Sequence, residues 1–428
     1  MKRRSISPLT IRRDARSGFL YVAVMVTTTL VAIIGLAAAS VAHREMRIVS
    51  QTTDLLEAQA LARSAVEQAL LKIENDANWR TTYIHGVEAP SLGEDVGTGT
   101  IAFKLLDSDG NLADDESDSV EVVGIGRVGD TVAAESVRLY PTGAGLTCLG
   151  ASFTCNGNIT LQYGADITTS QCVASNGNID ASSSGSSIVG SVEAAGTVLG
   201  AISGVITSGA TPKQLPGSDT FEYYRDNGTW IDFASLSSGK IENVVLSPSN
   251  NPFGTQTNAE GIYVIDCGGQ NVVIRNCRIL GTLLLLNPGS TSYVGYSVRW
   301  DAVVPNYPAL LVDGNFYIVH GKSDLSESSQ GVNFNPVGTP YGGSEDSDTT
   351  DTYPSGIRGL VFINGEFGNT LSGGNPIDGV LISQTSKIQS ACELTYRSTF
   401  NDYPPPGFAS GNPMRISPGS WKRATLSP

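Results

Sequence analysis

Five oxygen-bearing side chains recur along a short acidic segment between two apolar stretches. They are Asp107, Asp109, Asn111, Asp114 and Asp118. Oxygen ligands at alternate positions of a loop can converge on Ca²⁺, as they do in an EF-hand. The segment departs from that pattern, because Leu112 stands where an EF-hand has glycine and Asp118 where it has glutamate. The spacing predicts a Ca²⁺ site, and the competing interpretation is a hydrated hairpin tip whose charges prevent edge-to-edge pairing.

Other sequence motifs do not indicate a cofactor or a catalytic centre. Gly124, Gly126 and Gly129 match the pattern GxGxxG, but a dinucleotide site requires a helix after the glycines. A strand pattern follows here, so we interpret the glycines as part of a hairpin turn. The three histidines share no local motif. We therefore expect no histidine-based metal site and no cofactor other than Ca²⁺.

Charged residues in the second half of the chain leave one enzymatic alternative open. Polysaccharide lyases and hydrolases need convergent carboxylates, or Ca²⁺ with a basic residue, on one exposed face. The candidates are Asp266, Arg275, Arg278, Arg299 and Asp313. Single charges of this kind are usually solvated, so we expect a non-enzymatic protein.

The elements that would position these residues begin with an uncharged stretch of 25 residues, Gly18–Ala42. About 20 apolar residues suffice for a helix to cross a bilayer. Basic residues cluster ahead of the stretch, which favours a cytoplasmic N-terminus. We predict an uncleaved single-pass span over 19–42. A cleavable signal peptide is the alternative, although its apolar region is usually only ~7–15 residues long.

The helical pattern continues beyond the predicted span. Apolar and small side chains recur at helical spacing on one face: Ile48, Thr52, Leu55, Gln59, Ala62, Val66, Ala69 and Ile73. Neither proline nor glycine interrupts the sequence between Leu36 and Asp76. The pattern predicts one helix from about Phe19 to Asp76, roughly 85 Å long.

This combination resembles the type IV pilin-like proteins, including PilX-like minor pilins and the pseudopilins of type II secretion. The matching features are the basic leader (1–18), Gly18 followed by Phe19, the apolar run and its amphipathic continuation. The resemblance implies cleavage between Gly18 and Phe19 by a prepilin peptidase, and partners among pilin-like subunits and the assembly machinery. Ala23 departs from it, because most such proteins carry glutamate at the fifth mature position.

Residues 43–145 complete the predicted pilin-like unit. Three apolar runs, at Thr98–Leu106, Ser119–Val123 and Thr131–Leu139, are separated by turn-rich segments. This pattern predicts a small antiparallel sheet that packs on the amphipathic half of the helix.

Residues 146–428 show internal repetition. Asn-Gly-Asn-Ile occurs at 156–159 and again at 176–179, and short apolar runs start at residues 263, 283, 309, 360 and 380. Strands repeating every ~20 residues are typical of a solenoid. The protein is thus predicted to be mainly β, with a right-handed parallel β-helix interrupted by a polar insertion at 322–354 and closed by a Pro/aromatic C-terminal cap. A β-sandwich is the alternative.

Charge and cysteine content bound the partners and the compartment. The net charge of −14 disfavours nucleic acid as a partner. Six cysteines in an exported segment permit disulfides, and buried unpaired thiols are an equal alternative. We expect an exported envelope protein of the cytoplasmic (inner) membrane, with its body in the periplasm or at the cell surface. Its expected partners are membrane lipid, pilin-like subunits, and glycans or surface proteins.

Overall fold

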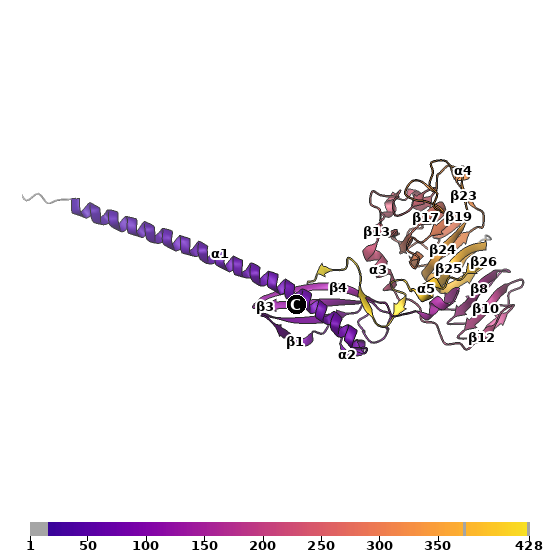
Figure 1. Ribbon diagram of the computed structural model, residues 1–428, viewed down its shortest axis with the longest axis horizontal. Helices are drawn as coiled ribbons and strands as arrows, with labels where there is room; N and C mark the ends of the chain where they lie inside the picture. The colour runs from indigo at the N-terminus through magenta and orange to yellow at the C-terminus, as the bar shows by residue number, and fades with distance from the viewer. Residues whose placement is uncertain (1–15, 371–373, 426–428) are drawn as a thin grey trace, which may run out of the picture.

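The computed structural model describes residues 16–370 and 374–425. The described chain comprises one long apolar helix, a small antiparallel sheet and a body of parallel strands (Figure 1). It is therefore mainly β with a long N-terminal helix, as the sequence predicts. Most of the basic leader, residues 1–15, lies outside the described residues.

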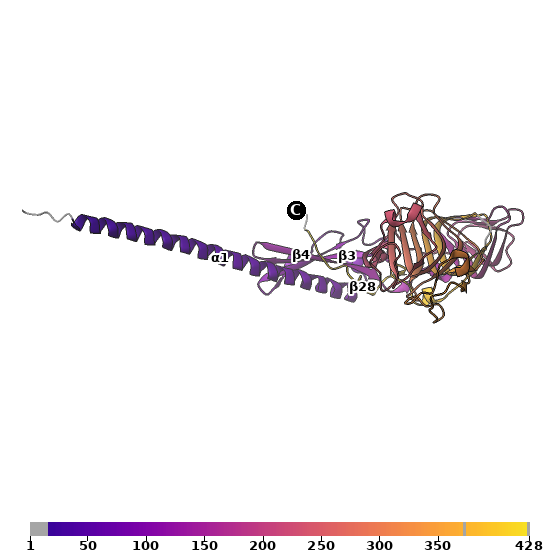
Figure 2. The same cartoon turned by 90° about the horizontal axis from the view of Figure 1, so that it is seen from above.

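The first element is α1, Arg16–Asn75, a continuous helix of 60 residues with a length of about 90 Å. Its N-terminal part projects away from the rest of the molecule (Figures 1 and 2). Burial begins near Ala58 and follows one stripe through Ala62, Val66, Ala69 and Ile73. Ile48 and Leu55, which the helical pattern placed on the same face, are exposed, because the sheet reaches only the last third of the helix.

The buried stripe of α1 packs on an antiparallel meander. A one-turn helix follows α1, and four strands come next: α2 Trp79–Thr82, β1 Ala89–Val96, β2 Gly99–Leu106, β3 Val120–Val128 and β4 Thr131–Pro141. Gly124 and Gly126 lie in β3 under the helix, and a Cβ on either would approach a backbone oxygen of α1 to 2.1 Å. They allow close helix–sheet contact, and only Gly129 occupies the hairpin turn predicted for all three.

The C-terminal segment returns to this sheet. Two further strands pair with β4 in antiparallel fashion, β28 Met414–Ile416 and β29 Lys422–Arg423. The segment is thus located differently from the predicted cap over a last coil. The physical reason lies in the body, where the last coil is not at an end of the stack.

The body consists of stacked strands, and those of its two main sheets pair in parallel throughout the described part of the chain. The strands of its first part are β6 Phe153–Cys155, β7 Ile159–Thr160, β8 Asp166–Ser175, β9 Ile179–Ala181, β10 Ser187–Ala194, β11 Val198–Gly200 and β12 Ile206–Ser208. Those of its second part are β13 Thr229–Trp230, β14 Lys240–Glu242, β15 Val245–Leu246, β16 Ile262–Asp266, β17 Val273–Leu280, β18 Thr282–Leu286, β19 Tyr293–Asp301, β20 Pro308–Asp313, β21 Phe316–His320, β24 Gly356–Asn369, β25 Gly374–Ile388 and β26 Cys392–Thr395. Parallel stacking differs from the antiparallel strands of most β-sandwiches.

Spatial order in the stack differs from chain order. The five apolar runs found in the sequence lie in β16, β18, β20, β24 and β25, which pair successively. β25 then pairs with β6, the first strand of the body, and β26 pairs with β8. The chain therefore enters and leaves the body near the middle of the stack, and β12 and β13 lie at its two ends.

Asparagines stabilise the corners of the first coils. Ile159 pairs with Ile179, so the two Asn-Gly-Asn-Ile repeats lie in adjacent coils. Asn176 Nδ2 donates to Asn156 Oδ1 at 3.0 Å, and the backbone N–H of Asn178 donates to Asn158 Oδ1 at 2.8 Å. The repeat is a ladder that satisfies polar groups where strands turn.

Short elements cover the outside of the stack. A second apolar cluster covers the outer side of β16, β18, β24 and β25, and Phe221, Phe400 and Phe408 contribute to it. The covering elements are β5 Ala144–Gly145, α3 Thr220–Asn227, α5 Thr399–Asp402 and β27 Ala409–Ser410. The polar insertion forms β22 Leu325–Ser326, α4 Glu327–Gln330 and β23 Thr352–Tyr353 around its own small apolar cluster. All six cysteines are buried and unpaired.

Candidate metal centre

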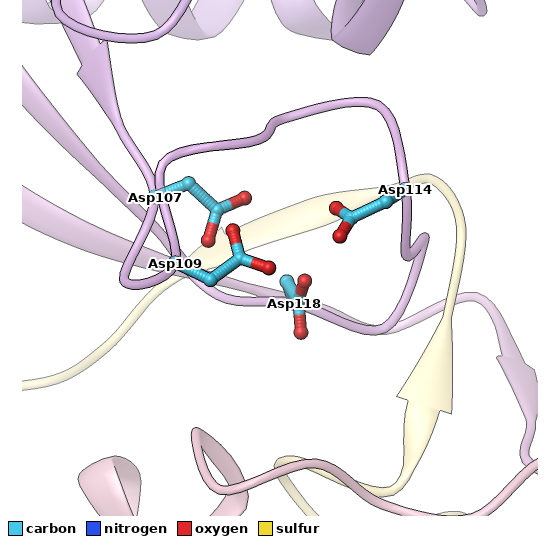
Figure 3. A group of neighbouring side chains, drawn as sticks. All are labelled: Asp107, Asp109, Asp114 and Asp118. Carbon is cyan, nitrogen blue, oxygen red and sulfur yellow. The ribbon is translucent and has the colours of Figure 1, made fainter.

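The acidic loop connects β2 to β3, so antiparallel pairing determines its shape. Leu106 pairs with Glu121, which brings the two ends of the loop together. Carboxylate oxygens of Asp107, Asp109, Asp114 and Asp118 all lie within 4.8 Å of one another. Figure 3 shows these four side chains around a common space. Four of the five residues predicted from the sequence are therefore neighbours in space.

Asp107 differs from the other three because its side chain is fully buried. Neither of its carboxylate oxygens has a hydrogen-bond partner among the residues that the structure describes, which is costly for a buried charged group. Burial, reinforced by Asp109, raises the pKa of Asp107 to about 6. Burial and the nearby Asp107 also raise the pKa of Asp118 to about 7. The geometry thus concentrates negative charge that a bound cation would neutralise.

Arg80, in α2, supplies the nearest positive charge, and sequence reasoning missed it. Its Nη2 donates to the carbonyl of Asp118 at 2.5 Å and its Nη1 to that of Leu112 at 3.2 Å. Its distance to the Asp107 carboxylate is 3.8 Å, too long for a hydrogen bond. One guanidinium leaves the four carboxylates incompletely compensated. No local sequence motif indicates that Arg80 belongs to the site, because it reaches the loop only through the packing of α2 on the sheet.

Asn111, the fifth predicted residue, shapes the loop. Its backbone N–H donates to Asp109 Oδ1 at 2.9 Å, and its own side-chain oxygen accepts the N–H of Ala113 at 3.4 Å. The carboxylates form a hard-oxygen donor set, which suits Ca²⁺ or Mg²⁺ better than zinc or copper. The residues present therefore fit a calcium ion.

A second acidic group lies in the polar insertion and differs in its hydrogen bonding. It comprises Glu327, Asp346 and Asp348. The buried Glu327 carboxylate accepts hydrogen bonds from the backbone N–H of Phe334 at 2.6 Å and from the Tyr353 hydroxyl at 2.8 Å. These bonds satisfy the buried charge, so the group works as an internal network of the insertion.

The acidic loop also contacts the body. Ser108 Oγ and Ser119 Oγ donate to the carboxylate of Asp219 at 2.9 and 3.1 Å. Next to them, Arg138 of β4 forms ion pairs with two residues of α3, Glu222 at 2.8 Å and Asp226 at 2.5 Å. The loop therefore lies at the junction between the helix–sheet unit and the parallel body.

The five charged residues of the enzymatic alternative are each engaged by other residues of the body. Arg278 is buried and donates to three backbone carbonyls of the insertion. Arg299 forms a bidentate pair with Asp301, and Arg275 pairs with Glu242. Asp266 Oδ1 accepts a hydrogen bond from the backbone N–H of Gly268, and Asp313 Oδ1 accepts one from Asn364 Nδ2, both at 3.0 Å. These side chains hold the structure of the body.

The predicted processing site falls within α1. Gly18 and Phe19 belong to the first turn of the helix, and Phe19 is exposed. One helix, Phe19–Asn75, is long and apolar enough to cross a membrane, and its apolar part is unburied among the described residues. This fits a single-pass membrane anchor.

Comparisons with known proteins give little further identification. No protein-family model and no curated protein matches the chain. A similar solved structure is the crystal structure of the competence-associated pilin ComZ from Thermus thermophilus, with 12% identity and a TM-score of 0.33. The alignment covers 87% of this chain and 98% of that one. Similarity at this level does not carry an argument about function, which must come from the residues themselves.

Proposed function

We propose that the chain is a minor pilin-like protein of the cell envelope, anchored in the cytoplasmic membrane by α1 and displaying its body outside. One observation carries the proposal: a single helix leaves its apolar N-terminal part exposed and packs only its C-terminal part on an antiparallel sheet. Leu20 and Ile34 are 69% and 61% exposed. Each Å² of apolar surface removed from water contributes about 25 cal/mol, so the exposed N-terminal part of α1 favours lipid or like helices over water.

Association with other pilin-like subunits follows from the same surface. After cleavage at Gly18, the exposed part of α1 would pack against equivalent helices in the membrane or in a filament. Ala23 lacks the charge that most pilins carry at this position, so the subunit joins by apolar packing alone. This suits a minor component better than a repeated one.

Calcium belongs to the proposal as a brace at the junction. The acidic loop contacts α3 through its serines, and a bound cation would remove the repulsion among its four carboxylates. A firm junction would hold the body in a fixed direction relative to the membrane anchor.

The body itself is proposed to be a right-handed parallel β-helix. Parallel pairing with offsets near 20 residues supports it, as in Tyr263 with Leu283 and Leu360 with Val380. Connections between parallel strands are right-handed in about 98% of cases. Such a body offers broad faces for structural, assembly or adhesive contacts.

N-terminal sequencing of the membrane-extracted protein tests the proposal. Pilin-type processing predicts a mature start at Phe19, and Gly18→Leu should leave the leader attached. Ser17→Ala is the matched control and should be processed normally. A mature start near Val41, with the protein in the soluble fraction, would contradict membrane anchoring and remove the pilin-like function.

Orientation has its own test, because the native thiols are buried. Thr349 is exposed in the insertion, so Thr349→Cys introduces a single accessible thiol. A membrane-impermeant maleimide should label this variant in intact spheroplasts. Labelling only after lysis would place the body in the cytoplasm and refute its display.

A further inference from the structure

An open groove lies on the outer face of the body, across β19, β21 and β25 and beside the end of β24. It has a volume of about 690 Å³, and three tyrosines line it, Tyr293, Tyr296 and Tyr317. Ligand sites commonly have volumes of about 300–1,000 Å³. We call this feature the tyrosine groove. Its described lining includes no residue of the acidic loop or of α1.

Glycines beneath two of the tyrosines hold their rings against the sheet. A Cβ on Gly368 would meet Tyr317 Cδ1 at 2.1 Å, and a Cβ on Gly295 would meet Tyr293 Cε2 at 2.9 Å. Any other residue at these positions would push the ring away. Each ring therefore lies against a glycine and stays half-buried, and Tyr293 and Tyr317 pair directly in adjacent strands.

The third tyrosine occupies a backbone position that is unfavourable for an aromatic residue. Asn243, Asn276 and Tyr296 follow corresponding strand residues in successive coils, and all three have positive φ, at 55°, 47° and 57°. Asparagine tolerates this left-handed conformation, whereas a bulky residue there is uncommon. Tyr296 is 59% exposed, so it gains no core packing in return.

The polar groups of the groove are suited to an uncharged ligand with many hydroxyls. Within the described part of the chain, the lining has Thr291, Thr370 and Lys387 but no carboxylate. The hydroxyls of its three tyrosines make no hydrogen bond to other described residues. The nearby Arg275 is engaged by Glu242 at 2.6 Å and lies 5.2 Å from the Tyr296 ring centroid. These groups offer hydrogen-bond donors and acceptors, and Lys387 supplies the one charge among the described lining residues.

Two other classes of ligand fit the groove poorly. Nucleic acid requires a basic surface, and the chain carries a net charge of −14. An extended peptide binds by pairing with a free strand edge, but the groove lies on a sheet face where neighbouring strands already use the backbone groups. An oligosaccharide needs neither a charge nor a strand edge.

We propose that the tyrosine groove binds a neutral glycan chain. The C–H face of a sugar ring carries partial positive charge and packs on the electron-rich face of a tyrosine. Tyrosine also presents a large contact area with little loss of conformational entropy. Tyr293 and Tyr317 lie on neighbouring strands, whose backbones are ~4.8 Å apart, so one glycan chain can contact both rings while the tyrosine hydroxyls and Lys387 bond the sugar hydroxyls. This inference does not depend on membrane anchoring.

Calorimetric titration of the full-length, detergent-solubilised protein tests the site. The probes are cellohexaose, chitohexaose, maltohexaose and mannohexaose. We expect at least one to bind with a Kd below about 1 mM, the weak end of specific affinity. Tyr317→Ala and Tyr293→Ala should each weaken that binding roughly 3- to 10-fold, the value of one aromatic contact.

Gly368→Ala is the sharper variant, because it keeps every tyrosine and only displaces the Tyr317 ring. It should weaken binding as much as removal of that ring. Tyr163→Ala is the control; Tyr163 is 80% exposed and lies outside the groove, so affinity should not change. Absence of binding by all four probes, or binding unaffected by Tyr317→Ala and Gly368→Ala, would overturn the proposal. Neither result bears on N-terminal processing.

Discussion

Removal of a single charge from the acidic loop gives the most informative test of the metal centre. Four carboxylates lie within 4.8 Å of one another, so their repulsion destabilises the metal-free protein. Asp109→Asn removes one charge and keeps the size of the side chain. In buffer with a chelator we expect this variant to be more stable than the wild type, by on the order of 1 kcal/mol for one close charge pair near the surface.

Calcium should reverse that order. Extracellular calcium sites have Kd values of about 10⁻⁴–10⁻³ M. At about 10 mM free Ca²⁺, mass action then stabilises the folded wild type by about 1.4–2.7 kcal/mol. For a unit of about 150–250 residues this raises the melting temperature by roughly 3–10 °C. Asp109→Asn should lose most of this rise, because a ligand is missing.

Differential scanning calorimetry with chelator and with added Ca²⁺ provides the assay. Glu116→Gln is the matched control, since Glu116 lies in the same loop but outside the group of carboxylates. It makes the same change of charge and should leave the calcium response intact. The reasoning is refuted if wild type shows no rise at millimolar Ca²⁺, or if both variants lose it equally.

Two further predictions concern packing and burial. Gly126→Ala should lower the free energy of unfolding by about 1–3 kcal/mol, because its Cβ would lie 2.1 Å from the Ala58 carbonyl oxygen of α1. The control Gly150→Ala should change it little, because a Cβ there would meet nothing within 4 Å. Equal urea midpoints for the two variants would contradict the packing argument. Burial lowers the pKa of His320 to about 4, below its unfolded value near 6.5, so protonation favours the unfolded chain and stability is lost as the pH falls from about 6.5 towards 4. Between pH 7.5 and 5.0, protonation of His320 lowers the free energy of unfolding by about 2 kcal/mol. Urea unfolding should show a smaller loss for His320→Gln and an unchanged loss for His43→Gln. Identical pH dependence in both variants would rule out His320 as the cause.

Local pattern determined much of this protein. The long helix is apparent from uncharged residues followed by helical spacing, with no proline or glycine between Leu36 and Asp76. The apolar runs that begin at residues 263, 283, 309, 360 and 380 became successive parallel strands, and Asn156–Ile159 stacked on Asn176–Ile179. Each of these features depends on neighbours in sequence, because helix and strand geometry fix which side chains share a face.

The candidate metal centre could be predicted in part from the sequence. Four carboxylates spaced along one hairpin loop converge because the strands on either side must pair. Their spacing was visible in the sequence, but the burial of Asp107 and the approach of Arg80 were not. Both result from packing of the short helix after α1 on the sheet.

Only the tertiary structure decided how distant segments meet. The first coil stacks on the last, and residues 414–423 return to β4, so part of the segment predicted as a terminal cap belongs to the antiparallel sheet. Gly124 and Gly126 proved to be contact positions under α1, and Gly368 a support for Tyr317. Such arrangements depend on which surfaces can bury one another across hundreds of residues, and periodicity within a single strand or helix does not encode that choice.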